Sequence, residues 1–186
     1  FENVLNGDAG RAKELLKQAG YDGTPVVLLH PTDLDVISKL PLVAKAQLEK
    51  AGFKIDLQSM DWNTLVSRVS TKKGPVSEGG WNAFATSWVQ VDILDPLMTP
   101  YLNASCDKAR AGWPCDEGIE KLRDQYMQAT TLEEKKKVAE AVQRREAEVV
   151  THIPLGEWFG VSAVRANVAT AAVPPPVTVL WGVTKK

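Results

Sequence analysis

The chain has 186 residues, of which 44% are hydrophobic and 24% charged, and its net charge is −1. This composition is that of an ordinary globular protein, long enough to bury a sizeable core. The near-neutral charge offers no basic surface for nucleic acid or for an anionic membrane. No apolar run approaches the roughly 20 residues that a membrane span requires. The abrupt start at Phe1, without an export signal, indicates a processed or excised piece of a longer protein.

The first part of the chain predicts two successive helix–strand units. Residues 8–20 have the apolar spacing of a helix capped by Asp8, and residues 25–29 form a continuous apolar run. Such a run is typical of a strand that is covered on both faces. A second helix is predicted around residues 37–51, followed by an alternating strand at 53–58. Short joints between these elements favour an α/β layer with parallel strands.

The next part predicts a further helix and strand, then a long loop and two more helices. Asp61 caps the helix, and the strand spans residues 83–88. The irregular stretch from 89 to about 115 is long for a connection in a compact domain. Such loops usually have a function or are held in place by cross-links or other contacts. Asp116 caps the first of the two later helices, and a Thr-x-x-Glu capping box at 131–134 opens the second.

Motifs for enzymatic chemistry are weak in this sequence. Asp92 and Asp95 lie in the loop that follows Trp88. Two carboxyl groups can act as the acid and the base of a hydrolase of the glycosidase type. Their spacing within a loop does not define the separation of the carboxyl groups. A single carboxylate that holds a cationic group of a ligand is the second interpretation. Neither a Gly-x-Ser-x-Gly motif nor a nucleotide-binding glycine loop occurs.

The two cysteines, Cys106 and Cys115, lie in one turn-rich stretch. Either they bridge a short loop, or they are two free thiols of a cytosolic protein. Together with His30 and His152 they would make four candidate zinc ligands, but none of the short spacings of zinc sites occurs. We therefore expect neither a metal site nor a cofactor.

The six tryptophans are the most unusual feature of the composition. Most tryptophans belong to the core or its edge. Trp62, Trp88 and Trp158 fall at or just past predicted strand ends, where ligands gather in open α/β sheets. Aromatic side chains there form rigid walls suited to varied organic ligands. The alternative is an interaction module whose tryptophans face a protein partner.

Six segments, taken in order, carry a resemblance to a known family. They are Ala12–Tyr21, Ala44–Ile55, Trp88 with Asp92 and Asp95-Pro96, Cys106 through Ile119, Ile153–Leu155, and Ala163–Val168. Together they resemble the C-terminal part of family 5 extracellular solute-binding proteins, the dipeptide, oligopeptide and nickel binders of ABC importers. The resemblance covers nearly the whole chain, and its specificity comes from the order and spacing of the segments.

This resemblance implies an α/β fold in which a mixed sheet flanked by helices forms one lobe of a two-lobed clamp. It implies the substrate-binding component of an ABC importer, not an enzyme, located in the periplasm or elsewhere outside the cytoplasm. The implied partners are a peptide or other small solute, the N-terminal lobe that this chain lacks, and the permease subunits, with no nucleic acid. A hydrolase using the Asp92/Asp95 loop and a protein-interaction module remain the alternatives.

The resemblance also implies the residues that contact the ligand. In peptide-binding relatives the aspartate of the tryptophan loop pairs with the α-amino group of the ligand, and Asp92 is the matching position. The step from Trp88 to Asp92 is one residue longer than the family pattern, and Ser87 replaces its glycine. The expected ligand contacts are Trp88 and Asp92, followed by Gln90, Trp62 and Trp158.

Two further expectations follow from the resemblance. Export to an oxidising compartment favours a disulfide between Cys106 and Cys115. We expect residues 1–165 to form the ligand-binding lobe and residues 166–186 to form an extended tail, since the prolines at 174–176 exclude a helix. We interpret the apolar end of this tail as returning to the missing lobe or to the hinge.

Overall fold

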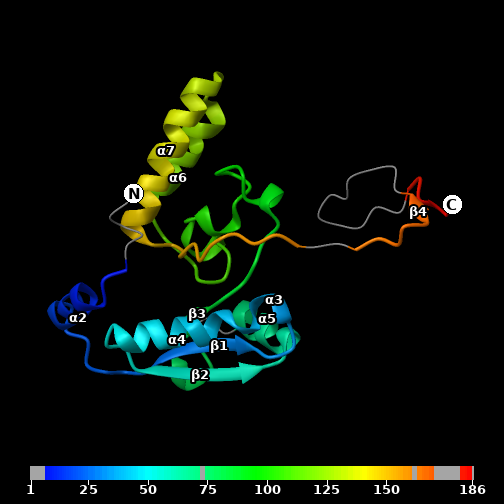
Figure 1. The fold of residues 1–186 in the computed structure, drawn as a ribbon. Helices are drawn as coiled ribbons and strands as arrows, with labels where there is room; N and C mark the ends of the chain where they lie inside the picture. Colours follow the sequence, from blue (N-terminus) through cyan, green and yellow to red (C-terminus); the bar gives the residue numbers. More distant parts are fainter. Residues whose placement is uncertain (1–6, 72–73, 161–162, 170–180, 186) are drawn as a thin grey trace. The chain divides into compact units, whose positions relative to one another are not determined.

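The computed structural model describes residues 7–71, 74–160, 163–169 and 181–185 (Figure 1). The chain divides into two compact units, residues 1–151 and 152–186. The second unit contains an antiparallel pair of short strands, β4 (Val168–Ala169) and β5 (Thr184–Lys185). The prolines predicted to shape the tail lie outside the described residues, and the predicted division after residue 165 stays a prediction.

The first unit is built around a parallel sheet with the strand order β2-β1-β3. Its strands are β1 (Val26–Pro31), β2 (Ile55–Met60) and β3 (Ala83–Phe84). The central position of β1 explains its continuous apolar run, because both of its faces are covered. The predicted strand at 25–29 and the predicted α/β class, with helices flanking a sheet, are confirmed.

The strand predicted over residues 83–88 is wrong beyond Phe84, and Pro31 supplies the physical reason. Val26 N donates to the Lys54 carbonyl on the β2 side, whereas Val27 exchanges hydrogen bonds with Asn82 on the β3 side. The backbone N–H groups of successive β1 residues therefore point alternately toward β2 and toward β3. On the β3 side, residue 31 would be the next donor after Leu29, and this residue is a proline. Because proline has no N–H, the ladder cannot continue, and the chain leaves the sheet.

The main hydrophobic core lies between the sheet and α5 (Trp62–Thr71). Val27 and Leu29 of β1 pack with Leu65 and Val69 of α5, and burying side chains of this size stabilises the fold by about 1.5–3 kcal/mol each. The helix begins as predicted, because the Asp61 carboxylate accepts a hydrogen bond from Thr64 N at 3.0 Å.

The helix predicted around residues 37–51 is two helices in the structure, α3 (Asp35–Ser38) and α4 (Leu40–Lys50). Pro41 lies in the first turn of α4, where its missing N–H costs no helical hydrogen bond. The first helix among the described residues, α2 (Ala9–Gln18), is capped by Asp8, which accepts from Arg11 N as predicted.

A helical hairpin completes the first unit, formed by α6 (Glu117–Gln128) and α7 (Leu132–Val149) packed against each other. Ile119 of α6 and Val142 of α7 are fully buried. Both predicted N-terminal caps are confirmed: the Asp116 side chain caps α6, and the Thr131–Glu134 capping box opens α7.

The long loop between β3 and α6 contains single turns of 3₁₀ helix, as expected for an irregular but ordered segment. These are η2 (Gln90–Asp92), η3 (Pro100–Leu102) and η4 (Cys106–Lys108); η1 (Val76–Glu78) precedes β3. None of the helices in the part of the chain that the structure describes has the length and apolarity needed to cross a bilayer.

A glycine at position 80 is required by the turn that leads into β3. A Cβ atom there would lie 2.1 Å from the Gly74 carbonyl oxygen and 2.8 Å from that of Pro75. We predict that Gly80→Ala lowers the free energy of unfolding of the purified protein by about 1–3 kcal/mol, measured by urea titration. Gly7→Ala is the matched control, since no atom lies within 4 Å of the added carbon. Equal stability of the two variants would contradict this role of Gly80.

Candidate ligand-binding site

The carboxyl ends of β1, β2 and β3 meet at one edge of the sheet because the three strands are parallel. This edge is where ligands bind in open α/β sheets. The loop after β1 and the start of α5 are joined here, since Asp33 Oδ1 accepts a hydrogen bond from Trp62 N at 2.8 Å. The loop that contains Trp88 follows β3 beyond the same edge.

Trp62 is half-buried at this edge and packs against the core cluster of β1 and α5. Its ring is therefore partly structural, in agreement with the usual role of tryptophan.

Trp88 is also half-buried, but it contacts a different set of side chains. Its ring meets the Tyr101 ring in an edge-to-face arrangement, with centroids 5.9 Å apart and an interplanar angle of 83°. The Arg110 guanidinium lies over the Trp88 ring at 4.8 Å from the centroid. Trp88 thus belongs to an aromatic–cation cluster outside the sheet core.

Gln90 and Asp92 lie on the turn η2 directly after Trp88, and both residues are exposed. The Asp92 backbone N–H donates to the Val89 carbonyl at 3.0 Å, which fixes the turn. The exposed carboxylate of Asp92 is accessible to a cationic group of a ligand.

Asp95 has a different environment from Asp92. It is half-buried, and its Oδ1 accepts a hydrogen bond from Leu97 N at 2.7 Å. Burial, together with a hydrogen bond to the Asp95 carboxylate, raises the pKa of the Tyr126 hydroxyl. Asp95 is thus held by its own turn and by α6, whereas Asp92 is exposed.

The structure places four of the five predicted contact residues in the first unit and one in the second. Trp88, Gln90 and Asp92 share one loop, and Trp62 lies at the sheet edge that precedes it. Trp158 lies in the second unit, where it is 56% exposed.

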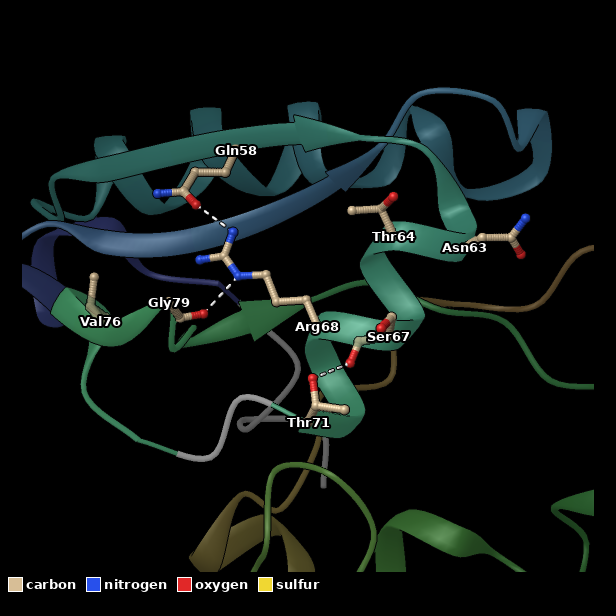
Figure 2. A pocket seen from close by; sticks show the side chains of 8 residues that line it. All are labelled: Gln58, Asn63, Thr64, Ser67, Arg68, Thr71, Val76 and Gly79. Carbon is tan, nitrogen blue, oxygen red and sulfur yellow. Dashed lines mark hydrogen bonds between the residues drawn. The ribbon is translucent and has the colours of Figure 1, made fainter.

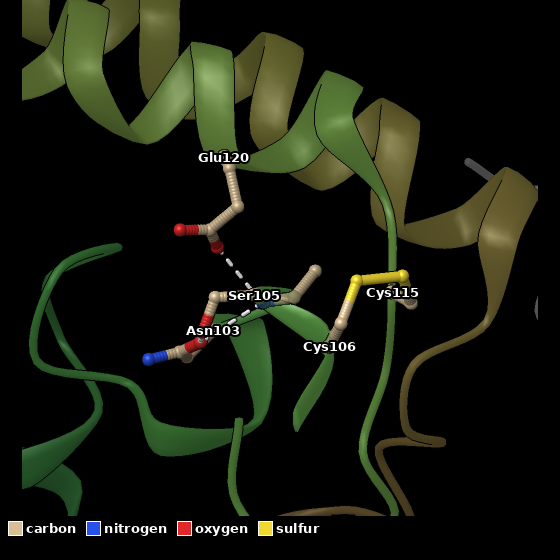
Figure 3. The surroundings of a disulfide bond; sticks show 6 residues. Asn103, Ser105, Cys106, Cys115 and Glu120 are labelled. Carbon is tan, nitrogen blue, oxygen red and sulfur yellow. Dashed lines mark hydrogen bonds between the residues drawn. A yellow bond between two sulfur atoms is a disulfide. The ribbon is translucent and has the colours of Figure 1, made fainter. Parts of the chain in front are cut away.

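The predicted disulfide between Cys106 and Cys115 is present (Figure 3). Cys106 N donates to the Pro114 carbonyl at 3.0 Å, and Ser105 pairs with Cys115 as an isolated antiparallel bridge. The bond converts residues 106–115 into a closed loop. Both sulfur atoms are consumed by it, so neither is a thiolate for zinc. No cluster of three or more metal-ligating side chains occurs among the described residues.

Helix α6 anchors the closed loop and the turn around Asp95. Glu120 Oε1 accepts from the backbone N–H of Ala104 at 2.7 Å (Figure 3). The same oxygen accepts from Arg123 Nη1 at 2.7 Å. Arg123 in turn donates to the Pro96 carbonyl at 3.2 Å. Sequence reasoning missed this anchor, although the spacing of Glu120 and Arg123 places them on one helix face.

An open depression of about 820 Å³ lies beside α5 (Figure 2). Its central side chain, Arg68, donates to the carbonyls of Gly79 and Gly80 and, at 2.6 Å, to Gln58 Oε1. These bonds tie the turn before β3 to β2 and α5, which is a structural role. None of the predicted ligand contacts lines this depression.

Comparison with known proteins identifies the class. Residues 2–111 match the model of the bacterial extracellular solute-binding proteins, family 5, middle region, and the chain belongs to this family. It is 33% identical over 179 residues to a probable peptide ABC transporter periplasmic-binding protein of Sinorhizobium fredii, covering 96% of this chain and 33% of that protein. It is 28% identical to di/tripeptide-binding protein 4 of Pseudomonas aeruginosa, covering 80% of this chain and 28% of that protein. The chain thus spans about a third of the length of these relatives.

Solved structures of similar fold bear on the predicted fold class. The substrate-binding protein CtaP of Listeria monocytogenes aligns with a TM-score of 0.64 at 18% identity, over 77% of this chain and 28% of CtaP. The oligopeptide-binding protein AppA of Bacillus subtilis, in complex with a nonapeptide, aligns with a TM-score of 0.60 at 18% identity, over 76% of this chain and 30% of AppA. These similarities confirm the predicted fold class.

The start of α6 depends on an ion pair whose strength varies with pH. Arg145 binds Asp116 through Nη2 at 2.7 Å and Nε at 3.2 Å, and with the Ile119 N–H it lowers the pKa of Asp116 below its ordinary value of 3.8. Asp116→Asn keeps a capping side chain but removes the charge. We predict a lower free energy of unfolding for this variant at pH 7, measured in urea.

The pH dependence of this difference tests the cause. A carboxylate with a lowered folded pKa stabilises above its unfolded pKa, and the stabilisation is lost as the pH falls through the folded value. The stability of the wild type should therefore approach that of Asp116→Asn as the pH falls below about 3.8. Asp124→Asn, at an exposed position of the same helix, is the control. A difference that does not change with pH would rule out the ion pair as its source.

Proposed function

We propose that this protein is the substrate-binding component of an ABC importer and that it captures a peptide or other small solute outside the cytoplasm. The family match over residues 2–111 carries the proposal. The relatives named as peptide ABC transporter and di/tripeptide-binding proteins support a peptide as the ligand class. The periplasmic-binding name of the first relative supports a periplasmic or other extracytoplasmic location.

In this proposal the chain supplies one wall of a cleft between two lobes, and the N-terminal lobe of the longer protein supplies the other. The exposed Asp92 carboxylate receives the α-amino group of the peptide, and Trp88 forms an adjacent aromatic wall. Gln90 adds a polar contact, and Trp62 and Trp158 are further contacts. Closure of the lobes then presents the loaded protein to the permease subunits.

We further propose that the protein is not an enzyme. A hydrolase using both loop aspartates needs two carboxyl groups that face one substrate. Asp95 accepts hydrogen bonds from its own turn and from Tyr126, which favours a structural role for it. Loss of turnover, rather than of binding, on substitution of Asp92 or Asp95 would support the hydrolase instead.

The first test is native mass spectrometry of the full-length protein purified without denaturation. We expect a co-purified solute, in the mass range of short peptides, that is released when the protein is denatured. A covalent adduct on an aspartate would indicate the hydrolase, and a stable protein complex without a small ligand would indicate the interaction module.

The second test addresses Asp92 directly. In the full-length protein, Asp92→Ala should weaken binding of a peptide with a free α-amino group by about 10- to 100-fold, because a charge-assisted hydrogen bond is lost. Titration calorimetry measures the dissociation constants.

The control ligand is the same peptide with an acetylated amino terminus, for which wild type and variant should bind with similar affinity. Asp124→Asn serves as the control for a general loss of negative charge. An equal loss of affinity for both peptides would contradict amine recognition by Asp92.

A further inference from the structure

The orientation of Trp88 depends on contacts with its ring and not on its indole N–H. Within the described part of the chain, Trp88 Nε1 is buried and has no hydrogen-bond partner. A hydrogen bond is the usual way in which a buried tryptophan is oriented. The contacts of its ring with Tyr101 and Arg110 are therefore the interactions that orient this side chain.

Arg110 contacts both aromatic rings of this cluster. Its guanidinium carbon is 4.8 Å from the centroid of Trp88 and 5.8 Å from that of Tyr101. Both distances are within the range of a cation–π interaction. One cation thus links the two rings and holds them in their edge-to-face arrangement.

The disulfide-closed loop, residues 106–115, fixes the backbone of Arg110. The Arg110 carbonyl accepts a hydrogen bond from Trp113 N at 2.8 Å, across a turn that places Gly112 at φ +110°. On one side of this turn Ala111 packs against the core cluster of β1 and α5. On the other side the Trp113 ring lies 6.1 Å from that of Trp81. The disulfide closes the loop on which these contacts depend.

We propose that Arg110 is a positioning residue: it fixes the ring of Trp88, and the Cys106–Cys115 disulfide acts on Trp88 through Arg110. The turn η2 begins two residues after Trp88, and the Val89 carbonyl holds Asp92 N in that turn. Arg110 therefore also fixes the starting point of the segment that presents Asp92. The effect on ligand affinity rests on the proposed function, whereas the effect on the Trp88 ring does not.

The test of ring positioning uses full-length protein labelled with 5-fluorotryptophan and ¹⁹F NMR without ligand. Trp88→Phe identifies the Trp88 resonance by its disappearance. We expect Arg110→Ala to shift and broaden this resonance and Arg110→Lys, which keeps the cation, to restore it in part. Lys108→Ala, which removes an exposed cation of the same loop, is the control and should leave the resonance unchanged. An unchanged Trp88 resonance in Arg110→Ala would overturn the proposal.

The role of the disulfide is tested with the Cys106→Ser/Cys115→Ser variant, alone and combined with Arg110→Ala. If the bond acts through Arg110, the serine variant should move the Trp88 resonance as Arg110→Ala does, and the combination should add little. If the resonance shifts of the serine variant and of Arg110→Ala add up in the combined variant, the disulfide and Arg110 act on Trp88 separately. That result would overturn this part of the proposal. Comparison of melting temperatures should show a loss of stability in the serine variant only, because Arg110 is exposed.

Binding of trialanine by titration calorimetry then tests the consequence for the proposed function. We expect Arg110→Ala to raise the dissociation constant by about 3- to 30-fold and Lys108→Ala to leave it unchanged. Unchanged trialanine affinity in Arg110→Ala, despite a shifted Trp88 resonance, would overturn the link to ligand binding. If wild-type protein does not bind trialanine, peptide recognition is the part that fails, and the NMR result still decides the role of Arg110.

Discussion

The disulfide between Cys106 and Cys115 is the constraint on which the arrangement of the candidate site depends. It closes a loop whose residues reach two parts of the first unit. Ala111 packs on the sheet core and Trp113 contacts Trp81 of that core, whereas Arg110 contacts Trp88. Closing a loop of this length restricts the unfolded chain and is worth about 2–3 kcal/mol in the chain-entropy model. A segment without regular secondary structure thereby acquires a defined shape.

The same loop is held on both sides of its disulfide by the helical hairpin. Glu120 accepts from Ala104 N just before the first cysteine, and Arg145 pairs with Asp116 just after the second. Arg123 extends this hold to the carbonyl of Pro96. Helix α6 therefore supports the loop that follows β3 at several points, and a loop that presents Asp92 and Trp88 stays ordered without strands of its own.

Asp92 and Asp95 show how environment separates two residues of one type. Asp95 has a partly buried carboxylate that accepts from Leu97 N and faces Tyr126, so its hydrogen-bonding capacity serves the fold. Asp92, three residues earlier, has an exposed side chain on a turn that its own backbone N–H holds. In the proposed function, Asp92 is the one carboxylate offered to a cationic group, whereas a hydrolase would need two. This proposal agrees with membership of a solute-binding family.

The sequence by itself determined the elements whose signals are local. The caps at Asp8, Asp61, Asp116 and Thr131 were predictable because each side chain bonds an N–H three residues away. The buried strand β1 was predictable from its apolar run, and the disulfide from the family resemblance. Only the tertiary structure decided the length of β3, because Pro31 limits it from a neighbouring strand. It also decided the contact of Arg110 with Trp88, since 22 positions separate them and the loop must fold before the cation meets the ring. Hydrogen bonds within one turn depend on neighbouring residues alone, whereas these contacts depend on how distant segments are brought together.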